Sequence, residues 1–225
     1  MTSACKVDRA LVLHLLGCTD ASLGPELDER LDAAIERCEH IARAESTWRL
    51  FEVREEPGCI EVVGTSLDLA GKEARKFLVG CRGVALMACT LGDAFEREQA
   101  TTSQPPVLDQ LMLDAAASSL VRVLARSCYA DIARAAKSRG LSAGTALEPG
   151  CSGIPLGVQP DLLGALDAKR VLGVSCTAYG NMLPSKSLTA LVGLFDGEHA
   201  DNSGCEICSF STYCELKKRG VSCTQ

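Results

Sequence analysis

The sequence predicts an α+β fold in which mixed helices surround a central, mostly antiparallel sheet. Helical and strand patterns alternate irregularly along the 225 residues, which favours α+β over a doubly wound α/β arrangement. Two strand-like segments, 48–55 and 59–63, flank a Pro57-Gly58 turn and predict an antiparallel hairpin. The chain also lacks the glycine signatures of P-loop and Rossmann nucleotide sites.

The composition is that of a folded chain with a substantial core, since 47% of the residues are hydrophobic and 23% are charged. A formal net charge of −6 and an aromatic content of 4% argue against nucleic acid as a partner, because such surfaces need positive charge and stacking platforms. No apolar run approaches the length that a membrane span requires.

The N-terminal segment allows two interpretations. Residues 11–16 form a short apolar run before Gly17-Cys18, which loosely resembles a lipoprotein cleavage box. The run contains His14 and follows Asp8, whereas a secretory segment is longer and free of such residues. A first helix, capped by Asp8 and ended by Gly17, is the preferred interpretation. The odd number of cysteines also does not suit a secreted disulfide framework, and we therefore expect a cytoplasmic protein.

The remaining elements follow from periodicity and from Gly and Pro breakers. Before the hairpin we expect a helix that Pro25 opens. After the hairpin we expect a short basic helix at 69–79, a buried strand at 84–89, a helix from about residue 93 and a long helix at 107–139. From residue 144 to 159 the chain reads as a Gly/Pro loop. A short helix at 160–166, a strand at 171–177, a loop at 178–185 and a strand at 188–195 complete the predicted order.

The 13 cysteines divide into a scattered set and a C-terminal set. An odd count within apolar patterns is unlike a secreted disulfide framework. The scattered ones are expected to act as small core hydrophobes: Cys38, Cys81, Cys89, Cys128 and Cys176.

The C-terminal set is Cys205, Cys208, Cys214 and Cys223, and it predicts a candidate metal site. A C-x2-C pair places two sulfurs on one side of a turn, which suits zinc or an iron–sulfur cluster. His199 could replace one cysteine. A reversible disulfide or free thiols remain alternatives. The chain is accordingly divided into a domain at 1–200 and a cysteine-rich tail at 201–225.

Two further segments are candidates for contacting a ligand. In 148–155, two prolines and two glycines fix the chain while leaving backbone groups uncovered, so the loop could contact a small ligand or could be an ordinary rigid surface loop. Segment 173–193 reads as a strand, a loop with Pro184 and a second strand. Lys186 in that loop could meet an anionic ligand, although an isolated loop lysine is usually solvated.

Together the two segments resemble the activation (reactivation) domain of vitamin B12-dependent methionine synthase. The family's P-G-Y-x-x-x-P loop corresponds to 149–155, its G-[VM]-x-L-T strand to 173–177, and its M-x-P-x-x-S motif to 182–187. Thr90-Leu91-Gly92 and the opening of the long helix also resemble stand-alone members. The resemblance covers roughly residues 8 to 195.

The resemblance implies a function in reductive remethylation. In that family an electron from a flavodoxin-type donor and a methyl group from S-adenosylmethionine restore methylcobalamin from cob(II)alamin. It further implies that Pro149, Gly150, Cys151 and Pro155 shape the S-adenosylmethionine site. Cobalamin would be held by a partner, either a corrinoid-binding protein or a split methionine synthase, and a flavodoxin- or ferredoxin-type protein would donate electrons.

The chain departs from the family at three positions. Cys151 stands where the family has tyrosine, Ala146 where it has arginine and Ala178 where it has an acidic residue. A carboxylate clamp and an aromatic wall contribute about 1.5–3 and 0.5–1.5 kcal/mol respectively. We therefore expect weak S-adenosylmethionine binding, or another ligand.

Two functions are compatible with these residues. The first is a stand-alone activation component, which as an enzyme would be part of a methyltransferase. The alternative is a metal or iron–sulfur binding module that kept the fold and lost the methyl donor.

Overall fold

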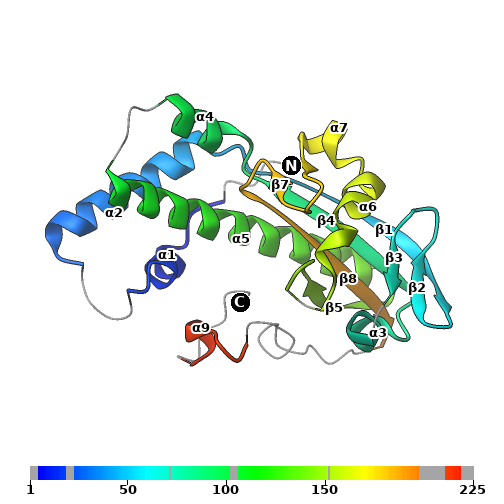
Figure 1. Ribbon diagram of the computed structural model, residues 1–225. Helices are drawn as coiled ribbons and strands as arrows, with labels where there is room; N and C mark the ends of the chain where they lie inside the picture. Colours follow the sequence, from blue (N-terminus) through cyan, green and yellow to red (C-terminus); the bar gives the residue numbers. More distant parts are fainter. Residues whose placement is uncertain are drawn as a thin grey trace.

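The computed structural model describes residues 5–18, 23–70, 72–101, 106–151, 153–197 and 211–218. At its centre is a six-stranded sheet with the strand order β3-β2-β1-β4-β8-β5 (Figure 1). Every neighbouring pair of strands is antiparallel. The bounds are β1 Glu45–Glu56, β2 Cys59–Val62, β3 Asp68–Ala70, β4 Gly83–Thr90, β5 Leu141–Leu147 and β8 Ser187–Asp196. The α+β fold with an antiparallel sheet is thus confirmed.

Strands β4 and β8 are the buried centre of the sheet. Every residue of β4 is buried, and in β8 only Asp196 is exposed. Helices cover both faces of these strands, which is why the two segments are nearly continuous apolar runs.

One face of the sheet is covered by α1 (Arg9–Leu15), α2 (Pro25–Ile41) and α5 (Val107–Lys137), with α4 (Ala94–Thr101) beyond the end of α2 (Figure 1). The expected cap is present, since the Asp8 carboxylate accepts from the Leu11 N–H at 3.1 Å. The middle of α5 packs closely on the sheet because Ala116 and Ala117 are small, and both are fully buried.

The other face is covered by shorter elements. These are α3 (Lys72–Leu78), the 3₁₀ turn η1 (Leu156–Val158), α6 (Gln159–Ala165), α7 (Ala168–Leu172) and a small ribbon of β6 (Ser175–Cys176) with β7 (Met182–Leu183). A second core forms here between α6 and the sheet, and it includes Leu162, Leu86 and Leu191. Helix α9 (Glu215–Lys218) lies in the C-terminal segment.

Three predicted elements were wrong in part. The helix expected at 69–79 begins only at Lys72, because Leu69 is buried opposite Ile60 as part of β3. The strand expected at 171–177 is helix α7 followed by the short β6, since Val171 is exposed and Gly173, with φ 70°, ends the helix. The loop expected from residue 144 begins inside β5.

The cysteine expectation holds for three of the five scattered positions. Cys38, Cys89 and Cys128 are buried, whereas Cys81 and Cys176 are half-buried. Among the described residues, no helix combines the length and the apolar character needed to cross a membrane.

Candidate functional site

The Pro-Gly loop leaves the end of β5 and is closed by its own backbone. The Gly150 N–H donates to the Ile154 carbonyl at 2.7 Å, and the Cys151 N–H donates to the Glu148 carbonyl at 3.0 Å. Pro149 and Ile154 are buried, which anchors both ends. Gly150 has φ 85°, a conformation that favours glycine. These two N–H groups are therefore committed within the loop, and a ligand would meet the loop's carbonyls and side chains instead.

A tight turn after β6 faces this loop. The Thr177 N–H donates to the Asn181 carbonyl at 2.8 Å and the Gly180 N–H donates to the Thr177 carbonyl at 3.0 Å. Thr177 Oγ1 also accepts from the Asn181 N–H at 3.2 Å. The turn thus fixes Gly180 with φ 83°.

Leu156 brings the loop and the turn together. A Cβ placed on Gly150 would lie 3.4 Å from Leu156 Cδ1, and one placed on Gly180 would lie 2.8 Å from Leu156 Cγ. Both glycines therefore leave room for one leucine between two segments that lie far apart in the sequence. The structure joins the two segments that carry the sequence resemblance.

A buried hydrogen bond holds the next element in place. The Thr189 hydroxyl of β8 donates to Gln159 Oε1 at 2.6 Å, and both side chains are buried. Because a buried amide left unpaired is costly, this bond positions the start of α6 over the sheet.

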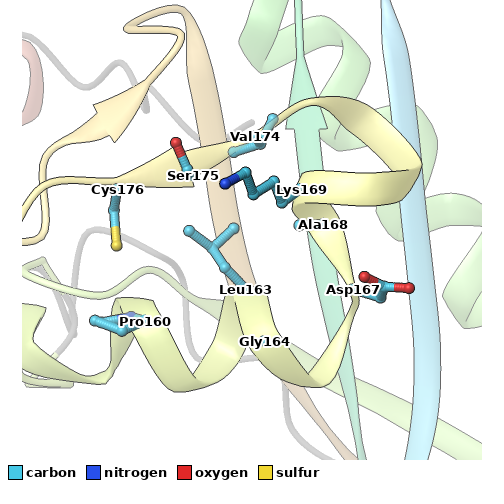
Figure 2. Close-up of a pocket in the computed structure, with 9 residues that line it drawn as sticks. All are labelled: Pro160, Leu163, Gly164, Asp167, Ala168, Lys169, Val174, Ser175 and Cys176. Carbon is cyan, nitrogen blue, oxygen red and sulfur yellow. The ribbon is translucent and has the colours of Figure 1, made fainter.

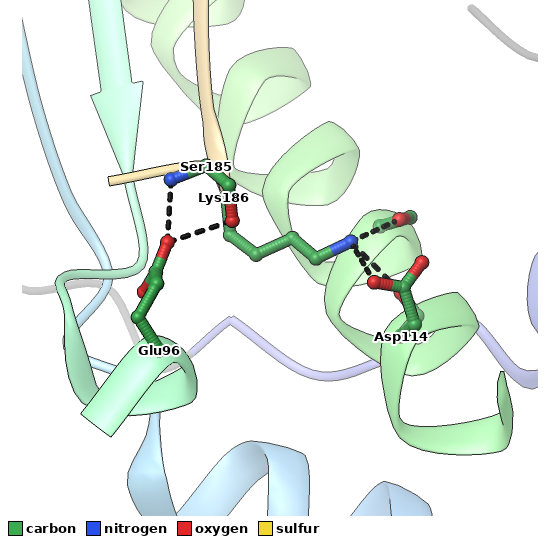
Figure 3. Close-up of polar contacts among 5 residues, drawn as sticks. Glu96, Asp114, Ser185 and Lys186 are labelled. Carbon is green, nitrogen blue, oxygen red and sulfur yellow. Dashed lines mark hydrogen bonds and ion pairs between the residues drawn. The ribbon is translucent and has the colours of Figure 1, made fainter. Parts of the chain in front are cut away.

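A polar cluster surrounds Ser185 and Lys186, the two residues directly before β8 (Figure 3). Lys186 Nζ forms an ion pair with Asp114 Oδ1 at 2.7 Å and donates to Ser118 Oγ at 3.0 Å. Its side chain is only 15% exposed. The expectation of a solvated lysine was therefore wrong, because α5 supplies partners that sequence proximity does not reveal.

Glu96 of α4 completes this cluster. Its Oε1 accepts from the Ser185 N–H at 2.6 Å and from the Ser185 hydroxyl at 2.7 Å. Burial raises the pKa of Glu96, but the Ser185 hydrogen bonds and the nearby Lys186 ammonium outweigh burial, so the net pKa is lowered. The second oxygen, Oε2, is buried without a partner among the described residues. This oxygen has no surface open to solvent and belongs to the interior of the cluster.

A second ion pair lies beside the Pro-Gly loop. Arg122 Nη1 of α5 is 3.3 Å from Glu148 Oε1, and the two side chains are 28% and 22% exposed. Asp114, Ser118 and Arg122 are spaced by four residues and so share one face of α5. This face connects the Lys186 cluster to the Pro-Gly loop over about 12 Å of helix.

The sequence-predicted site residues are placed as follows. Pro149 is buried, Cys151 is half-buried and Gly150 and Pro155 are exposed, all in the loop that Leu156 closes. Their role toward a ligand stays a prediction. Arg122, Glu96 and Asp114 were missed, and the signal that could have found two of them is the polar spacing of Asp114, Ser118 and Arg122 within an otherwise apolar helix.

The predicted tail site falls mostly outside the described residues. Cys205, Cys208 and Cys223 lie there, as does His199, while Cys214 is half-buried. In the part of the chain that the structure describes, no three metal-binding side chains come together. The tail metal site and the domain boundary near residue 200 stay predictions.

Comparison with known proteins finds similarity among solved structures. No family model matches the sequence, and no curated protein matches it. Among solved structures, the chain is similar to the crystal structure of the MetH reactivation domain bound to AdoHcy. The two share 14% sequence identity with a TM-score of 0.65, over 96% of this chain and 82% of that one. At this identity the similarity establishes the fold, which is that of a methionine synthase reactivation domain.

Proposed function

We propose that this protein is a stand-alone relative of the methionine synthase reactivation domain that binds S-adenosylmethionine and assists the reductive remethylation of a corrinoid protein. The observation that carries the proposal is the contact of Leu156 with both glycines, since it joins the two resembling segments on the matching fold. The MetH domain binds AdoHcy, the demethylated form of that ligand, in the matching structure.

The residues around the loop fit the polar groups of such a ligand. The carboxylate of its amino-acid end suits the Arg122 guanidinium, which retains further donors beyond the one nearest Glu148. The resemblance places an arginine at position 146, where this chain has alanine. Arg122 of α5 reaches the same end of β5, because its partner Glu148 lies two residues after Ala146. Arg122 would therefore provide the positive charge that Ala146 lacks. The carboxylate of Glu148 suits the ligand's ammonium group.

The Lys186 cluster lies at the other end of the polar face of α5, so an elongated ligand along this face would extend from the Pro-Gly loop toward it. Bound S-adenosylmethionine would supply the methyl group, while the corrinoid stays on the partner protein and a flavodoxin- or ferredoxin-type protein supplies the electron.

The surface next to the site suits a protein partner. Tyr179 and Leu183, on the turn and on β7, are 85% and 51% exposed, and Leu156 is 38% exposed. Exposed aromatic and aliphatic side chains grouped beside a ligand site are typical of a docking surface. A corrinoid-binding protein seated here would bring its cofactor next to the Pro-Gly loop.

Isothermal titration calorimetry with S-adenosylmethionine and S-adenosylhomocysteine tests the proposal. We expect saturable binding that Arg122→Gln weakens by about 10- to 150-fold, because hydrogen bonds to a charged group contribute about 1.5–3 kcal/mol. Arg126→Gln is the matched control, since Arg126 lies one turn further along α5 and is 3.8 Å from Asp8 instead of near the loop. No heat up to millimolar ligand, or equal loss in both variants, would contradict the proposal.

A further inference from the structure

A separate pocket lies on the α6–α7 face of the sheet (Figure 2). Its volume is about 270 Å³, below the roughly 300–1,000 Å³ of sites that take drug-sized ligands. It is therefore sized for a small molecule. Its lining comes from α6, α7, β6 and the short connections between them: Pro160, Leu163, Gly164, Asp167, Ala168, Lys169, Val174, Ser175 and Cys176.

Apolar side chains form the inner wall of the pocket. Leu163, Ala168 and Val174 are buried and belong to the second core, so the wall is fixed by packing against the sheet. Such a preformed apolar surface favours the aliphatic part of a ligand. At one end, the Cys176 thiol points toward Pro160 (Figure 2).

A positive charge lies over this apolar wall. The Lys169 side chain extends toward Ser175 above Leu163 (Figure 2). Within the described residues, neither the Lys169 ammonium nor the Ser175 hydroxyl forms an ion pair or a hydrogen bond. Both groups can therefore donate to an incoming acceptor without breaking an existing contact.

The one carboxylate of the pocket does not cancel this charge. Asp167 forms an ion pair with Arg170, and Figure 2 shows its carboxylate directed away from Ser175. Asp167 is also the only non-glycine residue with positive φ in the described part of the chain, at 53°. That conformation reverses the chain between α6 and α7, which places Lys169 back over the pocket.

We propose that this pocket binds a small aliphatic carboxylate, with the chain against Leu163 and Val174 and the carboxylate between Lys169 Nζ and the Ser175 hydroxyl. The site shares no residue with the Pro-Gly loop or with the Arg122–Glu148 pair. It therefore stands independently of the proposed S-adenosylmethionine site, and either can fail without the other.

Protection of Cys176 from alkylation provides the assay, because that thiol lines the pocket and is half-buried. The rate of modification by iodoacetamide is measured by peptide mass spectrometry, with half-buried Cys59 on the hairpin as the internal reference. The probes are hexanoate, hexan-1-ol and hexylammonium at equal concentrations. We expect hexanoate to slow the reaction of Cys176 most and hexylammonium least, with Cys59 unaffected.

Two variants and one control assign the effect to the pocket. Because Lys169 is exposed, Lys169→Met should weaken hexanoate protection by about two- to fivefold, the range for a solvent-exposed ion pair, and leave hexan-1-ol unchanged. Gly164→Leu should abolish protection, because a Cβ there meets open space and leucine favours the helix, so the pocket is filled while the fold is kept. Lys137→Met, an exposed lysine at the end of α5, is the matched control and should behave as wild type.

Three results would overturn the proposal. They are no protection of Cys176 by hexanoate in the wild type, equal protection by the three probes, and hexanoate protection that Lys169→Met leaves intact. The amide chemical shifts of Ser175 and Cys176 on titration with hexanoate provide a second measurement that does not depend on thiol reactivity. Absence of shifts at both amides would likewise overturn it.

Discussion

Substitution of Gly180 by alanine tests the contact that joins the two segments of the candidate site. The new methyl group would lie 2.8 Å from Leu156 Cγ and 3.0 Å from the Leu156 carbonyl oxygen, both closer than side chains tolerate. A non-glycine residue at φ 83° costs about 1–2 kcal/mol, and forcing a methyl into a packed position costs about 1–3 kcal/mol. We therefore expect Gly180→Ala to destabilise the protein by about 2–5 kcal/mol.

Gly140→Ala is the matched control. Gly140 has φ 74°, but a Cβ there meets nothing within 4 Å, so only the backbone cost applies. Urea unfolding of both variants measures the difference in their free energies of unfolding. In thermal unfolding, each 1 kcal/mol corresponds to about 2–4 °C in Tm for a chain of this size.

A double-mutant cycle with Leu156→Ala isolates the contact. That variant removes Leu156 Cγ and Cδ2, so Gly180→Ala should cost less in its background than in the wild type. Equal costs for Gly180→Ala and Gly140→Ala, or strict additivity with Leu156→Ala, would refute the packing of the loop against the turn.

Three further predictions concern the polar cluster and the core. Lys186→Met should destabilise the protein by about 1 kcal/mol in thermal unfolding, because the buried stem is kept while the ion pair is lost; an unchanged Tm would contradict the role of that pair. The pKa of Glu96 is lowered by its Ser185 hydrogen bonds despite burial, so its contribution to stability is present above the ordinary carboxyl pKa and is lost as the pH falls through the lowered value. Glu96→Gln should therefore be less stable than the wild type near neutral pH and converge with it in acid, as urea midpoints at several pH values would show; a constant gap would contradict this. Burial raises the pKa of Cys38 to about 12, so in the native protein at mildly alkaline pH iodoacetamide should modify Cys59 and leave Cys38 intact, which peptide mass spectrometry can check.

The sequence predicted those elements whose boundaries are set by local chemistry. Asp8 caps α1, Pro25 opens α2 and Gly140 follows the end of α5, and each acts through its own backbone or side-chain preference. The strand expected at 171–177 was wrong because β-branched Val171 favours a strand, whereas in the structure Val171 lies exposed on α7. Long-range packing decided that element.

Strand β5 was missed for a related reason. Its residues Ser142 to Ala146 are small and do not alternate, so they read as a loop, yet they pair with β8 around an irregularity between Ala143 and Ala146. Small side chains suit this strand because it packs against α5. Its composition reflects a neighbour that lies far away in the sequence.

The candidate site also combines residues that local sequence marks and residues that only long-range packing brings together. Proline and glycine marked the Pro149–Pro155 loop, because those residue types act locally. The partners of Lys186 and Glu148 come from α5, and no local pattern shows which strand end a helix residue faces. Arg122 could therefore be assigned to the loop only from the structure.

Chemical-shift mapping with S-adenosylhomocysteine tests the central claim most directly. In ¹⁵N-labelled protein the account predicts saturable shifts concentrated at the amides of Gly150, Cys151 and Gly153 and along the α5 face that carries Arg122. No shifts at millimolar ligand, or shifts confined to the α6–α7 pocket with the Pro-Gly loop unchanged, would contradict it.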